Sequence, residues 1–234
     1  MVGSPKIRIL SAGAPKAGVR LCAEANLRKS GDPFDVEFAT APTIHDRLAA
    51  GTAKADVIVA PCPLLEKFAA GGAIVAGSVV ELGSVAAAVA VRNGAREPDL
   101  GTVEGFRKAL LAADVLIYNR ASSGQYIGQL IESLGIARSV AGKTVRTDTG
   151  RGVMEYLAQD RSERPIAFGQ MTEIRLQEHL GIHLVGPLPR KIGKKTSYCA
   201  GLAATATDAE APRRLLELFR AGEGRRILRE TGVD

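Results

Sequence analysis

Short apolar segments alternate with segments of helical periodicity along most of this chain. The predicted strands are β-branched or continuously apolar: Ile7–Leu10, Val36–Phe38, Val57–Ala60, Val85–Val91, Val115–Tyr118, Thr144–Arg146, Ile166–Phe168, His183–Val185 and Tyr198–Ala203. Continuous apolar character is typical of strands in parallel sheets that helices cover on both faces. Aromatic residues make up only 4% of the sequence and Trp is absent, so the core must consist of aliphatic side chains. The alternation therefore predicts an α/β fold with mostly parallel sheets and right-handed crossovers.

The segments between the predicted strands carry helix start signals and one-sided apolar faces. Thr43 precedes the predicted helix Ile44–Ala50, and Asp46 stands three residues later, which is a variant of the capping box. A later helix has a buried face at helical spacing, formed by Ile127, Leu130, Ile131 and Leu134. Helices therefore connect the strands.

One long predicted strand indicates where the chain passes between two halves. Residues 82–92 are apolar and follow no helix, as expected where a chain crosses from one lobe to another. A second crossing is expected near residues 186–189, where two prolines stiffen an extended segment. We therefore predict one lobe from residues 1–82 and 190–234 and a second lobe from residues 83–189. The alternative is a single doubly wound sheet.

The net charge of +6 is spread along the chain and does not indicate a nucleic-acid-binding protein. The densest basic runs contain no aromatic residue for base stacking: Arg190, Lys191, Lys194 and Lys195, then Arg225, Arg226 and Arg229. No stretch approaches the ~20 apolar residues that span a bilayer, so no membrane insertion is expected. The N-terminal MVGSPKIRIL has no signal-peptide hydrophobic region. This predicts a cytoplasmic protein, or a periplasmic one if a signal was removed.

The cysteines and histidines predict neither a disulfide nor a metal site. Cys22, Cys62 and Cys199 are far apart and lack metal-ligand spacing, which fits a reducing compartment and buried, thiol-bearing small side chains. His179 and His183 stand four apart, but Gly181 predicts that the helix ends between them. No nucleotide or metalloprotease motif is present, so no cofactor is expected.

Four predicted strand-to-helix turns could bind an anion. They are residues 11–16, 38–43, 118–124 and 149–153, all rich in small or hydroxyl-bearing residues. Ligands of open α/β sheets bind beyond the carboxyl ends of strands, where helix N-termini present backbone N–H groups. Two such turns in each lobe would make an electropositive site in a cleft between the lobes without a metal. The alternative is that each turn serves only as a turn, and that Thr43 and Ser122 only cap helices.

Several segments carry a family resemblance by their order and spacing: ILSAGA, VEFATAPTIHDRLAAG, ADVIVAPCPLLEKFAAGGAIVAGS, VAVR, YNRASSGQYIGQLIESLGI, IAFGQMTEI and HLVGPLP. Over essentially its whole length the chain resembles the molybdate-binding family of type II periplasmic binding proteins. The resemblance implies a two-lobed fold with two mixed, mostly parallel sheets joined by crossover strands. It also implies hinge closure on a ligand held by hydroxyl groups and backbone amides of the four turns.

The family's molybdate contacts are only partly present in this sequence. The resemblance places its hydroxyl-bearing positions at Ala14, Ala41 and Phe168, none of which carries a hydroxyl. Its backbone-donor positions fall on Ser123 and Val153. Each lost hydroxyl donor should cost about 1–3 kcal/mol of binding free energy in a buried oxyanion site. Molybdate and tungstate are therefore not the expected ligands.

Cations near these turns favour a carboxylate instead. Lys16, Arg120 and Arg151 join the hydroxyl and amide donors, and a guanidinium fork matches the two oxygens of a carboxylate. The expected ligand is a small organic acid, and the alternative is that these arginines are surface residues. The predicted ligand contacts are Ser11, Gly13, Ala14, Lys16, Thr40, Ala41, Thr43, Arg120, Ser122, Ser123, Gly124, Arg151, Gly152, Val153, Phe168 and Gln170.

Three functions remain open from the sequence. The first is a solute-binding protein that delivers a small organic anion to the membrane subunits of an ABC importer. The second is a cytoplasmic isomerase that moves a proton on an unsaturated di- or tricarboxylate, since the broader fold looks similar to that of aconitate isomerase; the predicted bases are Glu173, Tyr126, Tyr198 and His45. The third is a cytoplasmic metabolite sensor.

Overall fold

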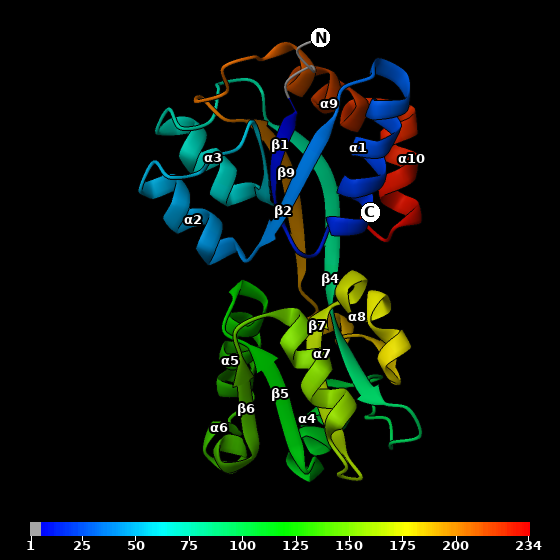
Figure 1. The fold of residues 1–234 in the computed structure, drawn as a ribbon. Helices are drawn as coiled ribbons and strands as arrows, with labels where there is room; N and C mark the ends of the chain where they lie inside the picture. Colours follow the sequence, from blue (N-terminus) through cyan, green and yellow to red (C-terminus); the bar gives the residue numbers. More distant parts are fainter. Residues whose placement is uncertain (1–5) are drawn as a thin grey trace. The chain divides into compact units, whose positions relative to one another are not determined.

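The computed structural model describes residues 6–234 (Figure 1). The strands are β1 (Ile7–Ala12), β2 (Phe34–Ala39), β3 (Val57–Pro61), β4 (Val80–Arg92), β5 (Val115–Asn119), β6 (Thr144–Thr147), β7 (Pro165–Gln170), β8 (Ile182–Pro187) and β9 (Lys195–Leu202). The α-helices are α1 (Lys16–Ser30), α2 (Ala41–Ala49), α3 (Cys62–Ala70), α4 (Val103–Ala112), α5 (Ser122–Ser133), α6 (Ala137–Val140), α7 (Gly150–Gln159), α8 (Met171–Leu176), α9 (Glu210–Arg220) and α10 (Gly222–Glu230). Short 3₁₀ helices are η1 (Ala141–Lys143), η2 (Glu178–Leu180) and η3 (Arg190–Ile192).

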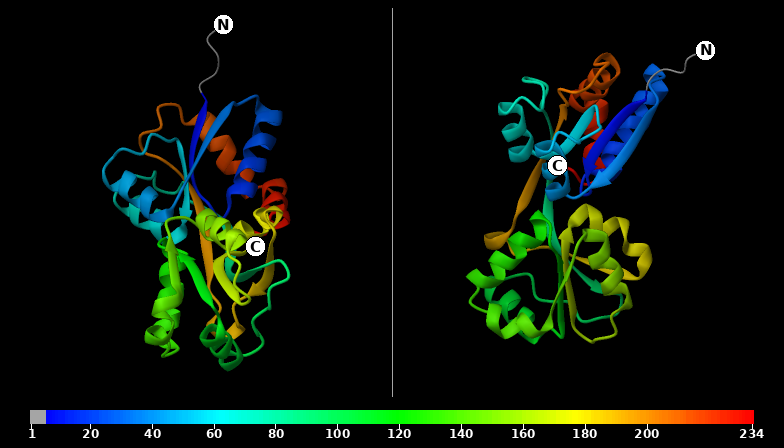
Figure 2. Two further views of the ribbon diagram at one scale, coloured as in Figure 1. Left: turned by 60° about the horizontal axis from the view of Figure 1, so that its bottom comes forward. Right: turned by 60° about the vertical axis from the view of Figure 1, so that its left-hand side comes forward.

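The first of two compact units runs to Val85 and resumes at Thr196–Asp234. Its central strand β1 pairs in parallel with β2 and β3, and β9 returns antiparallel to β3. Helices α1, α9 and α10 pack together on one face, while α2 and α3 lie on the other (Figure 1). Figure 2 shows the same two groups of helices from other sides. This is the helix-covered parallel arrangement that the apolar strands predict.

The second unit is Ala86–Lys195. Its strand β5 pairs in parallel with β6 and β7, while β4 runs antiparallel to both β7 and β8. One apolar cluster lies under α4, α5 and α6, and a second lies under α7 and α8. The residues 186–189 belong to this unit, and the chain leaves it at Lys195.

The two long strands β4 and β9 connect the units, because the unit boundaries fall within β4 and at the start of β9. Among the described residues, hydrogen-bonded neighbouring strands follow the order β2-β1-β3-β9-β4-β7-β5-β6, and β8 pairs with β4 outside this order. The prediction of an α/β fold with mixed, mostly parallel pairing and a long crossover strand is confirmed. No helix within residues 6–234 has the length and apolar character that crossing a membrane requires.

The predicted start of the second helix is wrong. Helix α2 begins at Ala41, and Thr40 is its N-cap, because the Thr40 hydroxyl accepts a hydrogen bond from the Thr43 backbone N–H at 3.3 Å. Pro42 lies in the first turn, where its missing N–H costs nothing since that group has no partner inside a helix. Thr43 is therefore inside the helix and does not cap it.

The prediction of unpaired cysteines is wrong for two of the three. Cys62 and Cys199 form a disulfide with a Cα–Cα distance of 4.8 Å across a sequence separation of 137 residues. The antiparallel pairing of β3 with β9 places Cys199 opposite Ala60, two residues before Cys62, so the contact arises from tertiary pairing. Cys22 remains a buried free thiol, and burial raises its pKa to about 12.

Candidate functional site

Three helices begin along one edge of the second unit's sheet. The parallel strands β7, β5 and β6 end at Gln170, Asn119 and Thr147, and the helices that follow them, α8, α5 and α7 respectively, start within four residues of those ends. The Arg120 backbone N–H donates to the Thr147 carbonyl at 2.8 Å, so the turns after β5 and β6 touch. This is the edge at which open α/β sheets bind ligands.

The start of α5 is organised by Asn119. Its buried side-chain amide oxygen accepts from the Gly124 backbone N–H at 3.1 Å, and its amide nitrogen lies 3.2 Å from the Ser123 hydroxyl. A Cβ at Gly124 would lie 1.8 Å from the Asn119 carbonyl oxygen, so only glycine fits here. The first N–H groups of the helix, those of Ser122 and Ser123, have no carbonyl partner within α5. They are available to an anion.

Arg146, on β6, adds a cation beside this helix start. Its Nη2 and Nε donate to the Asn119 carbonyl oxygen at 2.9 and 3.3 Å, and its guanidinium lies 4.3 Å from the centre of the Tyr118 ring. The side chain is half-buried and forms no ion pair within the described residues. A guanidinium held in this way keeps its orientation without losing its charge. Sequence reasoning missed both Asn119 and Arg146.

The start of α7 differs from the predicted donor arrangement. Thr149 caps the helix by accepting the Gly152 backbone N–H at 3.0 Å. The Val153 N–H, a predicted ligand donor, donates to the Thr149 carbonyl at 3.2 Å and is therefore engaged inside the helix. The groups with no carbonyl partner within α7 are the N–H groups of Gly150 and Arg151.

The two arginines chosen from the sequence lie in exposed ion pairs. Arg151 donates to the Glu155 carboxylate at 2.6 Å, four residues along α7, and its side chain is 72% exposed. Arg120 lies 3.5 Å from the Asp148 carboxylate and is 60% exposed. Exposed pairs of this kind contribute little stability.

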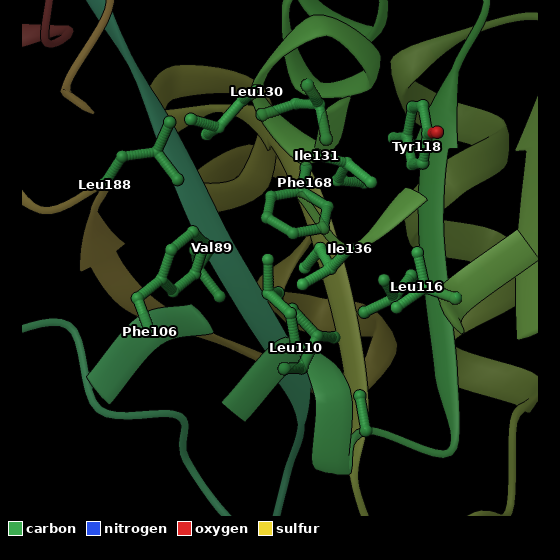
Figure 3. Close-up of a cluster of buried hydrophobic side chains, with 14 of the residues drawn as sticks. Val89, Phe106, Leu110, Leu116, Tyr118, Leu130, Ile131, Ile136, Phe168 and Leu188 are labelled. Atoms are coloured by element: carbon green, nitrogen blue, oxygen red, sulfur yellow. The ribbon is translucent and has the colours of Figure 1, made fainter. Parts of the chain in front are cut away.

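The two predicted contacts on β7 are both buried. Phe168 is 2% exposed and packs edge-on against Phe106 and Tyr118, with ring centroids 6.3 and 6.2 Å apart (Figure 3). It is a core residue of the cluster under α4, α5 and α6. Gln170 is the N-cap residue of α8 and lies at the edge, close in sequence to Glu173 in that helix's first turn.

In the first unit, the turns after β1 and β2 lie at one edge of the sheet, since Ala12 is in register with Ala39. Ser11 is buried within β1, and its hydroxyl donates to the Ala12 carbonyl at 2.9 Å. The Gly13 carbonyl accepts the N–H of Lys16, the first residue of α1. Ala14 is buried, and Ala41 is the first residue of α2 after Thr40, whose hydroxyl lies 2.9 Å from that of Thr43.

The predicted bases differ in their surroundings. The Tyr126 hydroxyl donates to the Ile192 carbonyl at 2.9 Å, and burial raises the pKa of Tyr126, so it is a poor base at neutral pH. His45 lies 3.0 Å from the Asp46 carboxylate in the first unit, and Tyr198 is buried in β9. Glu173 lies beside the start of α7, since a Cβ at Gly150 would lie 2.5 Å from its Oε2.

Comparison with known proteins places this geometry in context. The profile of a family described as bacterial extracellular solute-binding protein matches residues 7–234. A curated aconitate isomerase from Pseudomonas sp. is 28% identical over 97% of this chain and 87% of that protein. The periplasmic molybdate-binding protein of Azotobacter vinelandii superposes with a TM-score of 0.77 at 12% identity, covering 98% of this chain and 99% of that one. The sulfate-binding protein SubI of Mycobacterium tuberculosis gives a TM-score of 0.76 at 14% identity, covering 97% and 85%.

Proposed function

The chain belongs to the family of bacterial extracellular solute-binding proteins, and from this premise we propose that it binds a small organic anion and delivers it to an ABC importer. The predicted resemblance to molybdate-binding and related type II periplasmic binding proteins is confirmed by the structural matches. Those matches share the fold at low identity, so the ligand of this chain must be argued from its own residues.

The observation that carries the proposal is the start of α5. The backbone N–H groups of Ser122 and Ser123, the Ser123 hydroxyl and the positive end of a twelve-residue helix meet there, beside the Arg146 guanidinium. Backbone donors fix an oxygen atom, and the planar guanidinium can hold the two oxygens of a carboxylate through two parallel hydrogen bonds. We therefore propose that a ligand carboxylate lies at this helix start.

The positions that hold molybdate in the resembling family support a different ligand here. Ala14 and Ala41 bring no hydroxyl to the first unit's turns, and Phe168 is packed into the core of the second unit.

The disulfide supports an extracytoplasmic location. Cys62–Cys199 is the kind of bond that forms and persists in oxidising compartments such as the bacterial periplasm. The family description also names extracellular proteins. We therefore propose that the protein works in the periplasm rather than in the cytoplasm.

Thermal-shift and calorimetric titrations with a panel of anions test the proposed function. We expect a mono-, di- or tricarboxylate to stabilise the protein, by about 2.7 kcal/mol at a concentration one hundred times its Kd, and molybdate and sulfate to have little effect. Tight binding of molybdate, or stabilisation by no anion at all, contradicts the proposal.

A second candidate is an isomerase that acts on an unsaturated di- or tricarboxylate. It is favoured by the likeness to the Pseudomonas aconitate isomerase along nearly the whole chain and by the Glu173 carboxylate, a base at the ligand edge. Incubation with cis- and trans-aconitate, followed by proton NMR in D₂O, separates the two functions. Interconversion with deuterium uptake supports the isomerase, and unchanged spectra with measurable binding support the solute receptor.

A further inference from the structure

Several hydrogen-bond acceptors around the start of α5 are already occupied. The Asn119 carbonyl accepts from Arg146, and the Asn119 amide oxygen accepts from the Gly124 N–H at 3.1 Å. The Thr147 carbonyl accepts from the Arg120 N–H at 2.8 Å. A ligand that reaches this helix start therefore meets donors, namely the first N–H groups of α5 and the Arg146 guanidinium.

The side-chain amide of Asn119 has a defined orientation. A backbone N–H can only donate, so the amide oxygen, and not the amide nitrogen, must face Gly124. The amide nitrogen then lies 3.2 Å from the Ser123 hydroxyl oxygen, and the amide oxygen lies 3.4 Å from it. Because an amide nitrogen can only donate, the Ser123 oxygen accepts the shorter of these hydrogen bonds.

This hydrogen bond decides what the Ser123 hydroxyl offers to a ligand. Its oxygen accepts from Asn119, so its own proton can turn toward an anion. The Asn119 amide oxygen is the competing acceptor, but it is farther away and already accepts from Gly124. Asn119 is 3% exposed, so its amide is shielded from water. The chain of donors from Asn119 through Ser123 also polarises the hydroxyl and makes it a stronger donor.

We propose that Asn119 is a positioning residue that makes the start of α5 specific for an ionised carboxylate over a carboxamide. This inference rests on the proposed function and narrows its substrate class to acids that carry a free, unamidated carboxylate at this position. An ionised carboxylate only accepts hydrogen bonds, which matches a site of donors. The NH₂ half of a carboxamide would face those donors and leave polar groups unpaired, which costs affinity.

Calorimetry with acids and their amides tests the inference. The pairs are acetate and acetamide, lactate and lactamide, succinate and succinamide, and glutarate and glutaramide, in which every carboxylate becomes a carboxamide of similar shape. We expect the wild-type protein to bind at least one acid about tenfold or more tighter than its amide, because hydrogen bonds to a charged group are the stronger ones. In Asn119→Asp this preference should fall about tenfold, since the new carboxylate accepts the Ser123 proton and turns the hydroxyl inward.

A double-mutant cycle separates this positioning role from simple charge repulsion. If Asn119 acts through Ser123, then Asn119→Asp should reduce the preference about threefold less in a Ser123→Ala background, where no hydroxyl is left to turn. An equal reduction in both backgrounds is repulsion by the added charge and overturns the inference. Asn93→Asp, which adds the same charge at an exposed asparagine of the same unit, is the control and should keep the wild-type preference.

The remaining outcomes separate this inference from the proposed function. An unchanged preference in folded Asn119→Asp overturns the inference, while the proposed function stands. If Asn119→Asp does not fold, Ser123→Ala alone decides: we expect it to lower the preference about threefold through loss of one charge-assisted hydrogen bond, and no change overturns the inference. Binding of none of the four acids by the wild-type protein also overturns it, and the wider anion panel then decides whether the proposed function stands.

Discussion

At the scale of single residues, we expect Arg146 to be the side chain on which the proposed anion binding most depends. The guanidinium is oriented by the Asn119 carbonyl and the Tyr118 ring, and it stands next to the free N–H groups at the start of α5. A cation oriented in advance loses little conformational entropy when a carboxylate binds. Its fork of donors, rather than its charge alone, should set the affinity.

We expect Arg146→Gln to weaken binding of the best carboxylate ligand about tenfold or more, because a charge-assisted hydrogen bond is lost. Arg146→Lys should recover only part of the loss, since it restores the charge without the fork. Calorimetric titration measures both. Arg161→Gln, an exposed arginine of the same unit, is the control. An Arg146→Gln variant that binds as tightly as the control contradicts the assignment.

The sequence predicts the strand-to-helix turns of the second unit more reliably than the contacts of the side chains in those turns. Arg151 stands in a glycine-rich turn, which favours a ligand contact. Glu155 stands four residues later, however, and this i,i+4 spacing already predicts the ion pair that the structure shows. The Arg120–Asp148 contact and the position of Arg146 beside Asn119 depend on the pairing of β5 with β6, which local patterns do not reveal. Phe168 is a different case, because its apolar side chain is itself the signal that it lies in the core.

At the scale of elements, apolar patterning located every predicted strand, but helix starts were placed less well. Strands β3, β5 and β7 are buried at nearly every position, so their composition is constrained throughout, whereas β2 and β6 are only half-buried or exposed. A helix start, by contrast, depends on one capping residue and one turn, so the sequence gives it few signals. In α2, Pro42 stands inside the first turn, so the helix begins earlier than predicted. The start of α5 has a stricter requirement, since Gly124 lies against the Asn119 carbonyl.

Two glycines of α5 should respond oppositely to substitution by alanine. Gly124→Ala places a Cβ 1.8 Å from the Asn119 carbonyl oxygen, so we expect a loss of about 2 kcal/mol or more and weaker anion binding. At Gly128 the nearest neighbour, the Tyr118 ring, is 3.9 Å away, so Gly128→Ala should stabilise the protein by about 0.5–1 kcal/mol. Urea unfolding of both variants measures the difference, and equal effects would contradict the predicted contact.

At the scale of the whole molecule, the disulfide is the feature that the sequence did not reveal. Cys62 follows β3 and Cys199 lies on β9, both in the first unit, and all of the second unit lies between them in the chain. Three widely spaced cysteines gave no pairing signal, because the contact requires the pairing of β9 with β3. The long predicted strand at residues 82–92 lies within β4, and the boundary between the two compact units falls inside that strand.

We expect loss of the disulfide to destabilise the protein substantially. In the chain-entropy account, a bridge across 137 residues contributes about 5 kcal/mol, and Cys62→Ser should lose a large part of it. Cys22→Ala, which leaves the bridge intact, is the control. Urea unfolding measures both, and thiol titration of the unreduced, denatured wild-type protein should find one reactive thiol. Finding three would contradict the disulfide.

The disulfide also joins the two ends of the segment from Cys62 to Cys199, so that this segment forms a covalent ring. The whole second unit is part of that ring. A protease that cleaves one peptide bond anywhere between the two cysteines would open the ring without releasing a fragment. The nicked protein would migrate as one species on a non-reducing gel and separate into two only after reduction. After a single cut in any loop of the second unit, the two pieces of the chain therefore stay covalently linked by a disulfide that lies in the first unit.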